Sequence, residues 1–356
     1  MEKFKKSIKI FNYSKKEKIS FFDGKMINLV KSHYNLCKPY KNMLKLFNYN
    51  LDNKNIKKIP PLPVSLFKNI DLLSVKKNKI IKTLLSSGTS GIVPSKIYLD
   101  GENSKNLTWV LTKIVESILG KKRIPMLIVD QNPRHSNRYN FNARIAAING
   151  FSIFGKNITY LIDNNNKFKI NELNKFLSIY GNDNFLIFGF TSIVYQHLLK
   201  NDISRKLKYN LKKGILIHGG GWKKLTDISI TNKMFKDSFR KKYSLNKIHN
   251  YYGLVEQTGS IFIECEKCSL FKCSIYSDIF IRDKHLNIIE EKGKKGFLQV
   301  MSLIPSSYPG NNLLTEDIAE IVDSKKCKSC THNYYGKLFK VYGRANNSEI
   351  RGCSNI

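Results

Sequence analysis

The chain has 356 residues, enough for one large α/β unit or two domains, and its hydrophobic content of 42% with 12% aromatic residues excludes a disordered protein. Its formal net charge of +34 raises the alternative of a basic nucleic-acid-binding protein. The lysines are scattered in short groups, however, and no recognised nucleic-acid-binding motif accompanies them. An AT-rich coding bias also accounts for the abundance of Lys, Asn and Ile, so nucleic acid is the less favoured partner.

The sequence predicts a cytoplasmic protein without a membrane span. The first residues contain no apolar run that could serve as a signal peptide, and no stretch of about 18 apolar residues follows. The chain has seven cysteines, an odd number, and five of them lie between Cys265 and Cys330. Because disulfides are rare in the cytoplasm, these thiols indicate metal binding or thiol chemistry.

In chain order, the first eighty residues have a helical, lysine-rich pattern that a proline cluster at 60–63 interrupts. Apolar residues from Leu107 to Ile118 repeat at helical spacing, and Gly120 follows as a stop. Alternation of helical patterns with buried strands predicts an α/β fold with a parallel sheet. From about residue 274 the sequence pattern is instead that of strands joined by turns. The predicted buried strands are the short apolar runs at 126–129, 185–188 and 215–217.

A loop rich in Ser, Thr and Gly spans residues 86–96 and follows an apolar stretch. Its glycines allow backbone N–H groups to surround phosphate oxygens, its hydroxyls add donors, and Lys96 adds a positive charge. The Gly-Lys-Ser/Thr ending of a Walker P-loop is absent. A phosphate-binding loop and a flexible polar turn are equally compatible with these residues alone.

Three further segments carry side chains suited to a nucleotide. The Tyr251–Glu256 segment supplies an aromatic ring that can stack on a base and a carboxylate that can hold magnesium. Asp317 could accept hydrogen bonds from both ribose hydroxyls, and Arg344 offers a guanidinium for ribose or phosphate. A surface acid, a strand end and a loop arginine are the plainer interpretations, but the order and spacing of all four segments make chance a poor explanation.

These segments resemble the acyl-protein synthetase (LuxE) family within the adenylate-forming superfamily, which is related to phenylacetate-CoA ligase. The resemblance implies an adenylate-forming α/β domain at 81–342 after a helical region at 1–80, and then a truncated hinge with a cysteine tail at 343–356. It implies that the mobile C-terminal domain of larger relatives is missing. The stretches that carry the resemblance are 86–100, 188–191, 218–224, 252–265, 302–305, 307–310, 313–317 and 351–354.

The resemblance also implies roles for individual residues. The phosphate loop would contain Lys96, and the His218–Gly221 segment would pass along the adenine. Tyr252 would contact adenine, Asp317 would hold the ribose and Arg344 would close the nucleotide site, while Glu256 would bind magnesium. The remaining members of the implied ATP site are Ser86, Ser87, Gly88, Thr89, Ser90, Gly91, Gly219, Gly220 and Gly253.

The implied activity is ATP-dependent conversion of a carboxylic acid to acyl-AMP, with transfer of the acyl group to Cys353. The family implies a fatty acid, and smaller acids of the kind used to decorate surface sugars fit equally well. A ligase that acylates coenzyme A or a carrier protein is the alternative, and an acyl-reductase or carrier protein would be the partner. The Cys353 thiol would need its pKa lowered by positive charge, which Arg351 could supply. The chain departs from the family at Asn355, where Asp is common.

Two Cys-x-x-Cys pairs have the spacing of zinc ligands, although the long gap between them weakens this prediction and free cysteines are the alternative. Resemblance to phenylacetate-CoA-ligase-like proteins implies a structural zinc that stabilises the β-rich subregion. Cys268 is the alternate to Cys273 in the implied ligand set, which is Cys265, Cys273, Cys327 and Cys330.

Overall fold

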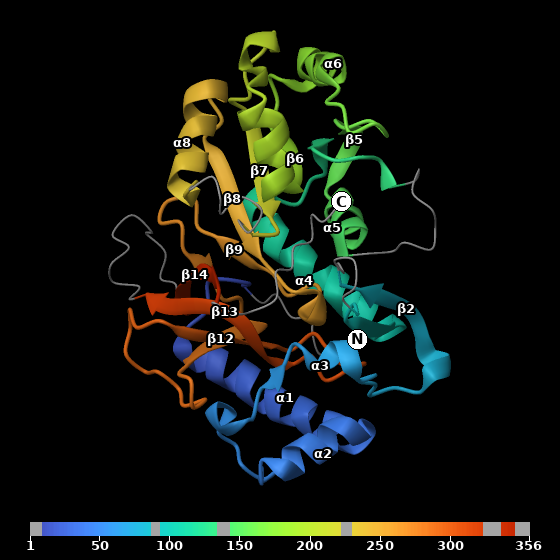
Figure 1. Ribbon diagram of the computed structural model, residues 1–356, viewed down its shortest axis with the longest axis vertical. Coiled ribbons are helices and arrows are strands. Elements are labelled where there is room, and N and C mark those ends of the chain that lie inside the picture. Colours follow the sequence, from blue (N-terminus) through green and yellow to red (C-terminus); the bar gives the residue numbers. More distant parts are fainter. Residues whose placement is uncertain (1–8, 87–92, 134–142, 222–229, 323–335, 346–356) are drawn as a thin grey trace. The chain divides into compact units, whose positions relative to one another are not determined.

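The computed structural model describes residues 9–86, 93–133, 143–221, 230–322 and 336–345. The chain forms two compact units (Figure 1). Of the described residues, those up to 118 and from 253 to 345 form the first unit, and those from 119 to 252 form the second. The first unit is therefore made from two distant stretches of the chain.

The N-terminal part of the first unit begins with two helices, α1 (Lys15–Leu36) and α2 (Lys38–Leu46). Ser14 and Glu17 form a capping box, in which each side chain accepts a hydrogen bond from the backbone of the other. Helix α2 ends at residue 46, and the proline cluster forms a short extended strand, as a run of prolines favours. The elements that follow are a 3-10 turn (Ile56–Lys58), β1 (Leu62–Pro63), α3 (Leu66–Asn69) and a second 3-10 turn (Lys77–Lys79).

A β-hairpin and a long helix complete this part of the first unit. Strands β2 (Ile80–Leu85) and β3 (Lys96–Asp100) pair antiparallel and are joined by the Ser/Thr/Gly loop. Helix α4 (Gly101–Leu119) confirms the predicted helix and buries Val110 and Ile114. It is followed by Gly120, which has a φ of 78°, a conformation that favours glycine after a helix.

The C-terminal part of the first unit is an antiparallel sheet, which confirms the predicted β-rich subregion. Its strand order is β11-β12-β13-β14-β10-β9, and β1 pairs parallel with β13 through Leu62 and Leu313. The strands are β9 (Phe262–Glu264), β10 (Phe271–Lys272), β11 (Ser277–Arg282), β12 (Gly296–Ser302), β13 (Asn312–Val322) and β14 (Leu338–Arg344).

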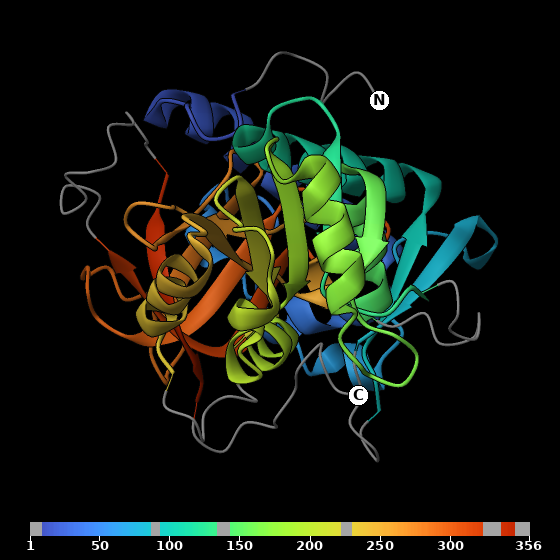
Figure 2. The ribbon, with the colours of Figure 1, turned by 90° about the horizontal axis from the view of Figure 1, so that it is seen from above.

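The second unit is a parallel sheet with the order β5-β4-β6-β7-β8. Every residue of β6 and β7 is buried, as the continuous apolar runs predicted. Figures 1 and 2 show these strands side by side with helices along them. The strands are β4 (Ile124–Ile128), β5 (Gly155–Tyr160), β6 (Phe185–Phe190), β7 (Gly214–Gly219) and β8 (Lys247–Tyr252); the helices and helical turns are α5 (Ala143–Ser152), α6 (Ile170–Tyr180), α7 (Thr191–Val194), a π turn (Tyr195–Lys200), a 3-10 turn (Ile203–Lys206) and α8 (Asn232–Tyr243).

None of the helices within the described part of the chain has the length and apolar character that crossing a bilayer requires.

Candidate functional site

Two of the predicted nucleotide residues face each other in the first unit. Asp317 on β13 and Arg344 on β14 are directly opposite in the antiparallel register, and the register shifts immediately afterwards, between Ile318 and Ala319. Arg344 Nη1 lies 3.3 Å from Glu316 Oε2, and the backbone N–H of Asp317 donates to Thr315 Oγ1. Irregularities of this kind re-aim side chains at sheet edges and active sites. Asp317 is thus the backbone partner of Arg344, while the ion pair of the guanidinium is with the neighbouring Glu316.

The predicted magnesium residue, Glu256, lies in a 3-10 turn (Val255–Gln257) and is only 6% exposed. The next residue anchors this turn, since Gln257 Nε2 donates to the carbonyls of Val300 and Gly310. Burial and the negative charge of Glu256 raise the pKa of Tyr308, so its phenol stays protonated. The carboxylate therefore stands on a backbone that cannot easily shift.

Asn103 connects this region to the β2–β3 hairpin, a role that the sequence motifs did not reveal. Its Oδ1 accepts hydrogen bonds from the backbone N–H groups of Ser306 and Ser307, at 2.7 and 3.2 Å. The Ser307 hydroxyl donates to the carbonyl of Tyr98 on β3. Because Asn103 is fully buried at the start of α4, it holds the 306–310 loop against the strand that leaves the phosphate loop.

The base of the predicted phosphate loop is described, whereas its centre is not. Ser86 and Ser95 bond reciprocally, since Ser86 N–H donates to the Ser95 carbonyl and Ser95 N–H donates to Ser86 Oγ. Lys96 is exposed and pairs with Leu85 at the end of the hairpin. The hydroxyl oxygen of Ser86 thus closes the loop. Ser87, Gly88, Thr89, Ser90 and Gly91 lie outside the described residues.

In the second unit the predicted adenine segment leaves the carboxyl end of β7. The Thr191 hydroxyl donates to the Gly219 carbonyl and lies 2.9 Å from His218 Nδ1, so this ring nitrogen carries the proton. Burial, together with the positive charge of Lys236 and the neighbouring His249, lowers the pKa of His218 to about 3. The ring is neutral at physiological pH and positions the backbone of the segment.

The two glycines of this segment are required by aromatic neighbours. A side chain on Gly219 would overlap the Tyr251 ring, and one on Gly220, which has a φ of 88°, would overlap Phe190. Tyr251 stacks on Phe188 within the unit, and both Tyr251 and Tyr252 are partly buried. Side chains alternate along a strand, so the two tyrosines project to opposite faces of β8. Tyr251 therefore lies on the face of β8 that carries its contact with Phe188, and Tyr252 lies on the other face.

A buried ion pair at the carboxyl end of β4 was not predicted. Arg144 donates to both carboxylate oxygens of Asp130, at 2.9 and 2.7 Å. His197 lies in the field of this pair, and burial lowers its pKa. The signal in the sequence was an aspartate directly after a buried strand, where ligands of parallel sheets bind.

The described cysteines of the predicted zinc set lie at different ends of one hairpin. Cys265 follows β9 at the turn, where its N–H donates to the Leu270 carbonyl, and Cys268 is in the same turn. Cys273 follows β10 at the opposite end. Within the residues described, no group of three or more His, Cys, Asp or Glu side chains could hold a metal. Cys327 and Cys330, like Cys353 and Arg351, lie outside that part of the chain.

Several solved structures share the fold of this chain. A 2-hydroxyisobutyryl-CoA ligase in the postadenylation state superposes with a TM-score of 0.72 at 12% identity, covering 96% of this chain and 70% of that one. The same ligase in the thioesterification state gives 0.73 at 12%, covering 96% and 71%. The amide bond synthetase McbA from Marinactinospora thermotolerans gives 0.50 at 13%, covering 75% of this chain and 49% of that one. The fold is that of the adenylate-forming ligases.

The family follows from the sequence. The model of the acyl-protein synthetase LuxE matches residues 5–356, nearly the whole chain, and the chain therefore belongs to the LuxE acyl-protein synthetase family. Among curated proteins, none matches the sequence.

Proposed function

We propose that this protein activates a carboxylic acid with ATP, forming acyl-AMP and pyrophosphate, and then passes the acyl group to a thiol. The observation that carries this proposal is the pairing of Asp317 with Arg344 across β13 and β14. A carboxylate can accept both ribose hydroxyls, while the adjacent guanidinium can hold an anionic oxygen of the same nucleotide. Membership of the LuxE family over residues 5–356 supports the same activity.

In the first half-reaction a carboxylate oxygen attacks the α-phosphorus, the bond to the bridging oxygen breaks and pyrophosphate leaves. Two anions must approach each other, so cationic and N–H donors aimed at the phosphates lower the barrier. Arg344 and Lys96 are the described cations that we assign to this task, and Tyr252 and the Gly219–Gly220 backbone would contact the adenine. The buried Glu256 carboxylate is a suitable oxygen ligand for magnesium, which would neutralise phosphate charge when bound.

In the second half-reaction a thiolate sulfur attacks the acyl carbon, the bond to the phosphate oxygen breaks and AMP leaves. We assign Cys353 as the acceptor and a fatty acid as the substrate, both on the family resemblance. Coenzyme A or the thiol of a carrier protein is the alternative acceptor.

A structural zinc is the second component of the proposal. Cys265 and Cys268 in one tight turn fit the spacing of two zinc ligands, and Cys327 and Cys330 would supply the other two. The hairpin geometry favours Cys268 over Cys273, because Cys273 follows the far end of β10. The metal would stabilise the β9–β10 hairpin and take no part in acyl transfer.

A two-stage assay tests this function. Pyrophosphate exchange across a panel of carboxylic acids of increasing chain length identifies the acid, and absence of exchange with every acid would refute adenylation. With the best acid, wild-type protein should retain a radiolabelled acyl group after denaturation and release it with hydroxylamine. Cys353→Ser should exchange pyrophosphate normally but retain no label, because serine without a dedicated base is a weak nucleophile. Normal labelling of Cys353→Ser would show that a residue other than Cys353 accepts the acyl group.

A further inference from the structure

Strand β5 forms one edge of the parallel sheet in the second unit. Among the described residues it pairs with β4 alone. An edge strand presents unpaired backbone groups, which proteins normally protect with charged side chains or bulges. The first half of β5 has both devices, since Lys156 is exposed and Asn157, with a φ of 49°, is an extra residue in the register. The second half, Ile158 to Tyr160, has neither.

The backbone of this second half is oriented for pairing. The N–H of Leu161 donates to the Ile128 carbonyl on β4, at 2.9 Å. Because backbone groups alternate in direction along a strand, the N–H and C=O groups of Ile158 and Tyr160 point away from β4, towards the open edge. Two donors and two acceptors are therefore arranged along about 7 Å of strand.

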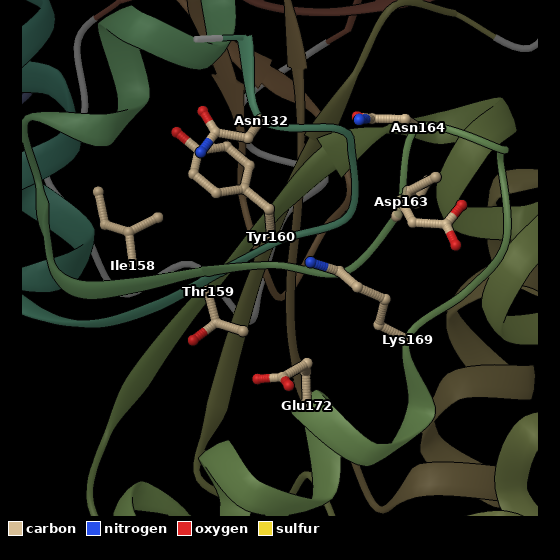
Figure 3. Close-up of a pocket in the computed structure, with 9 residues that line it drawn as sticks. Asn132, Ile158, Thr159, Tyr160, Asp163, Asn164, Lys169 and Glu172 are labelled. Atoms are coloured by element: carbon tan, nitrogen blue, oxygen red, sulfur yellow. The ribbon is translucent and has the colours of Figure 1, made fainter. Parts of the chain in front are cut away.

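A cavity of about 400 Å³ lies along the same half-strand and is lined by all three of its residues. Figure 3 shows Ile158 and Tyr160 projecting to one side of the strand and Thr159 to the other, so the strand is seen from its edge. Lys169 and Glu172, one turn apart at the start of α6, bound the cavity, and in Figure 3 the Lys169 side chain reaches towards the strand. The cavity therefore combines the strand edge with one positive side chain, Lys169, and two negative ones, Asp163 and Glu172.

We propose that a second copy of this chain occupies this edge, with the two β5 strands paired antiparallel about Thr159. This register places Ile158 opposite Tyr160 of the second copy in hydrogen-bonded pairs, and Thr159 opposite itself in a non-hydrogen-bonded pair. Aromatic–β-branched and Thr–Thr pairs are among the favourable cross-strand combinations. The segment is thus complementary to itself, which is the requirement of a two-fold interface.

The surface of α6 has the same self-complementarity. Glu172, Lys175 and Ile179 are spaced by three and four residues, so they lie on one face of the helix, and all three are exposed. Ile179 is 59% exposed, which is high for a large apolar side chain. A two-fold axis perpendicular to the sheet sets two copies of α6 antiparallel on the same face, where acidic and basic side chains of one copy meet their opposites on the other. Mixed charges with an apolar residue beside them suit such a contact.

The oligomeric state of the full chain tests the proposal. Sedimentation velocity should be run from about 5 to 200 µM, because a contact made by one short strand and one helix surface is expected to be weak. About 0.3 M salt should be present, because it screens the repulsion between two strongly basic chains. We expect a concentration-dependent monomer–dimer equilibrium. A chain that stays monomeric at the highest concentration would overturn the proposal.

Two sets of variants identify the surface. Tyr160→Pro removes an outward-facing N–H and should weaken dimerisation at least about tenfold, whereas Tyr160→Val keeps the N–H and should change it less.

Lys169→Glu and Glu172→Lys should each weaken the dimer, and the double variant should restore it. Lys241→Glu, an equal charge change on exposed α8, is the control and should have no effect. Dimerisation of Tyr160→Pro as strong as that of wild type, or a double variant weaker than either single one, would refute the arrangement.

Thermal unfolding of each variant separates loss of pairing from loss of fold. If Tyr160→Pro melts early, the charge reversals at Lys169 and Glu172 decide the question, since they leave the backbone of β5 unchanged. The proposal is independent of the acyl-AMP chemistry, and a monomeric but active protein would refute this inference alone.

Discussion

Asp317 and Arg344 are opposite each other on β13 and β14, and this pairing places a hydrogen-bond acceptor beside a cation. We expect Asp317→Asn, which keeps the shape of the side chain, to lower kcat/KM for ATP in pyrophosphate exchange by about 10- to 150-fold, the usual range for hydrogen bonds to a charged group. Glu320→Gln on the same strand is the control and should behave like wild type. An equal loss in both variants would show that general charge, and not ribose binding, is being measured.

Gly310 should matter for activity although it is not itself a ligand. A Cβ at this position would lie 2.5 Å from the Glu256 carbonyl oxygen and would overlap the Tyr308 ring. Gly310→Ala should therefore displace the Glu256 turn, raise the magnesium concentration needed for half-maximal pyrophosphate exchange several-fold and destabilise the protein by about 1 to 3 kcal/mol, as overpacking usually does.

The matched control for that variant is Gly24→Ala. Gly24 lies within α1 and has no atom within 4 Å of the position where a Cβ would be. Alanine should leave activity unchanged and raise stability by up to about 1 kcal/mol, because glycine is unfavourable inside helices. If Gly310→Ala showed an unchanged magnesium requirement, the Glu256 turn would not be sensitive to packing at Gly310.

His33 should make the protein sensitive to acid. It is fully buried, with Nδ1 2.6 Å from Ser74 Oγ and Nε2 3.1 Å from the Pro305 carbonyl. Burial lowers its pKa to about 4, against 6.5 for the free side chain. Between pH 4 and pH 6.5, His33 is therefore protonated in the unfolded chain and neutral in the folded chain. The stabilising contribution, about 3 kcal/mol, is present above pH 6.5 and is lost as the pH falls to about 4.

Chemical denaturation at pH 7, 5 and 4 measures this contribution. His33→Leu should be less stable than wild type at pH 7, because the Ser74 and Pro305 partners are left without a hydrogen bond. Its free energy of unfolding should fall less steeply with acid. An identical slope in the two proteins would assign the acid sensitivity to other groups, such as His218.

The cysteine pairs predict about one equivalent of zinc per chain by elemental analysis, and removal of the metal should lower the melting temperature. Cys265→Ser and Cys268→Ser should lose the metal, whereas Cys273→Ser should retain it, because Cys265 and Cys268 share one turn. Cys37→Ser, at the junction of α1 and α2, is the control for handling of the protein. Metal-free wild-type protein of unchanged stability would contradict the zinc site, and loss in Cys273→Ser alone would reverse the ligand choice.

The parts of the fold that the sequence predicted are those with a strong local signal. The apolar runs at 126–129, 185–188 and 215–217 are buried strands, because only a strand covered on both faces is apolar without interruption over that length. Strand β5 was not predicted, because its sequence, Gly-Lys-Asn-Ile-Thr-Tyr, is that of a half-exposed edge. The proline cluster interrupts the helical pattern of the N-terminal region, and the extended segment from residue 60 pairs with β13, a partner that no local signal indicates.

The candidate site shows the same limit. The sequence pointed to Asp317 and Arg344 separately, but their pairing depends on a register that shifts at the next residue, which no local pattern encodes. The role of Asn103 was not predicted, because its partners, Ser306 and Ser307, are about two hundred residues away in the chain. Residues that position a site through such distant contacts carry no motif of their own.

The pairing of Leu62 with Leu313 joins two segments that are translated at different times. A ribosome adding about 5 to 20 residues per second needs roughly 10 to 50 s between making these two residues. During that interval the residues of the second unit emerge as one uninterrupted segment and can fold. Lys18 and Met26 on α1 still lack their partners at Ser274, Ser277 and Asn311, so the first unit is not complete until its last strands have been translated.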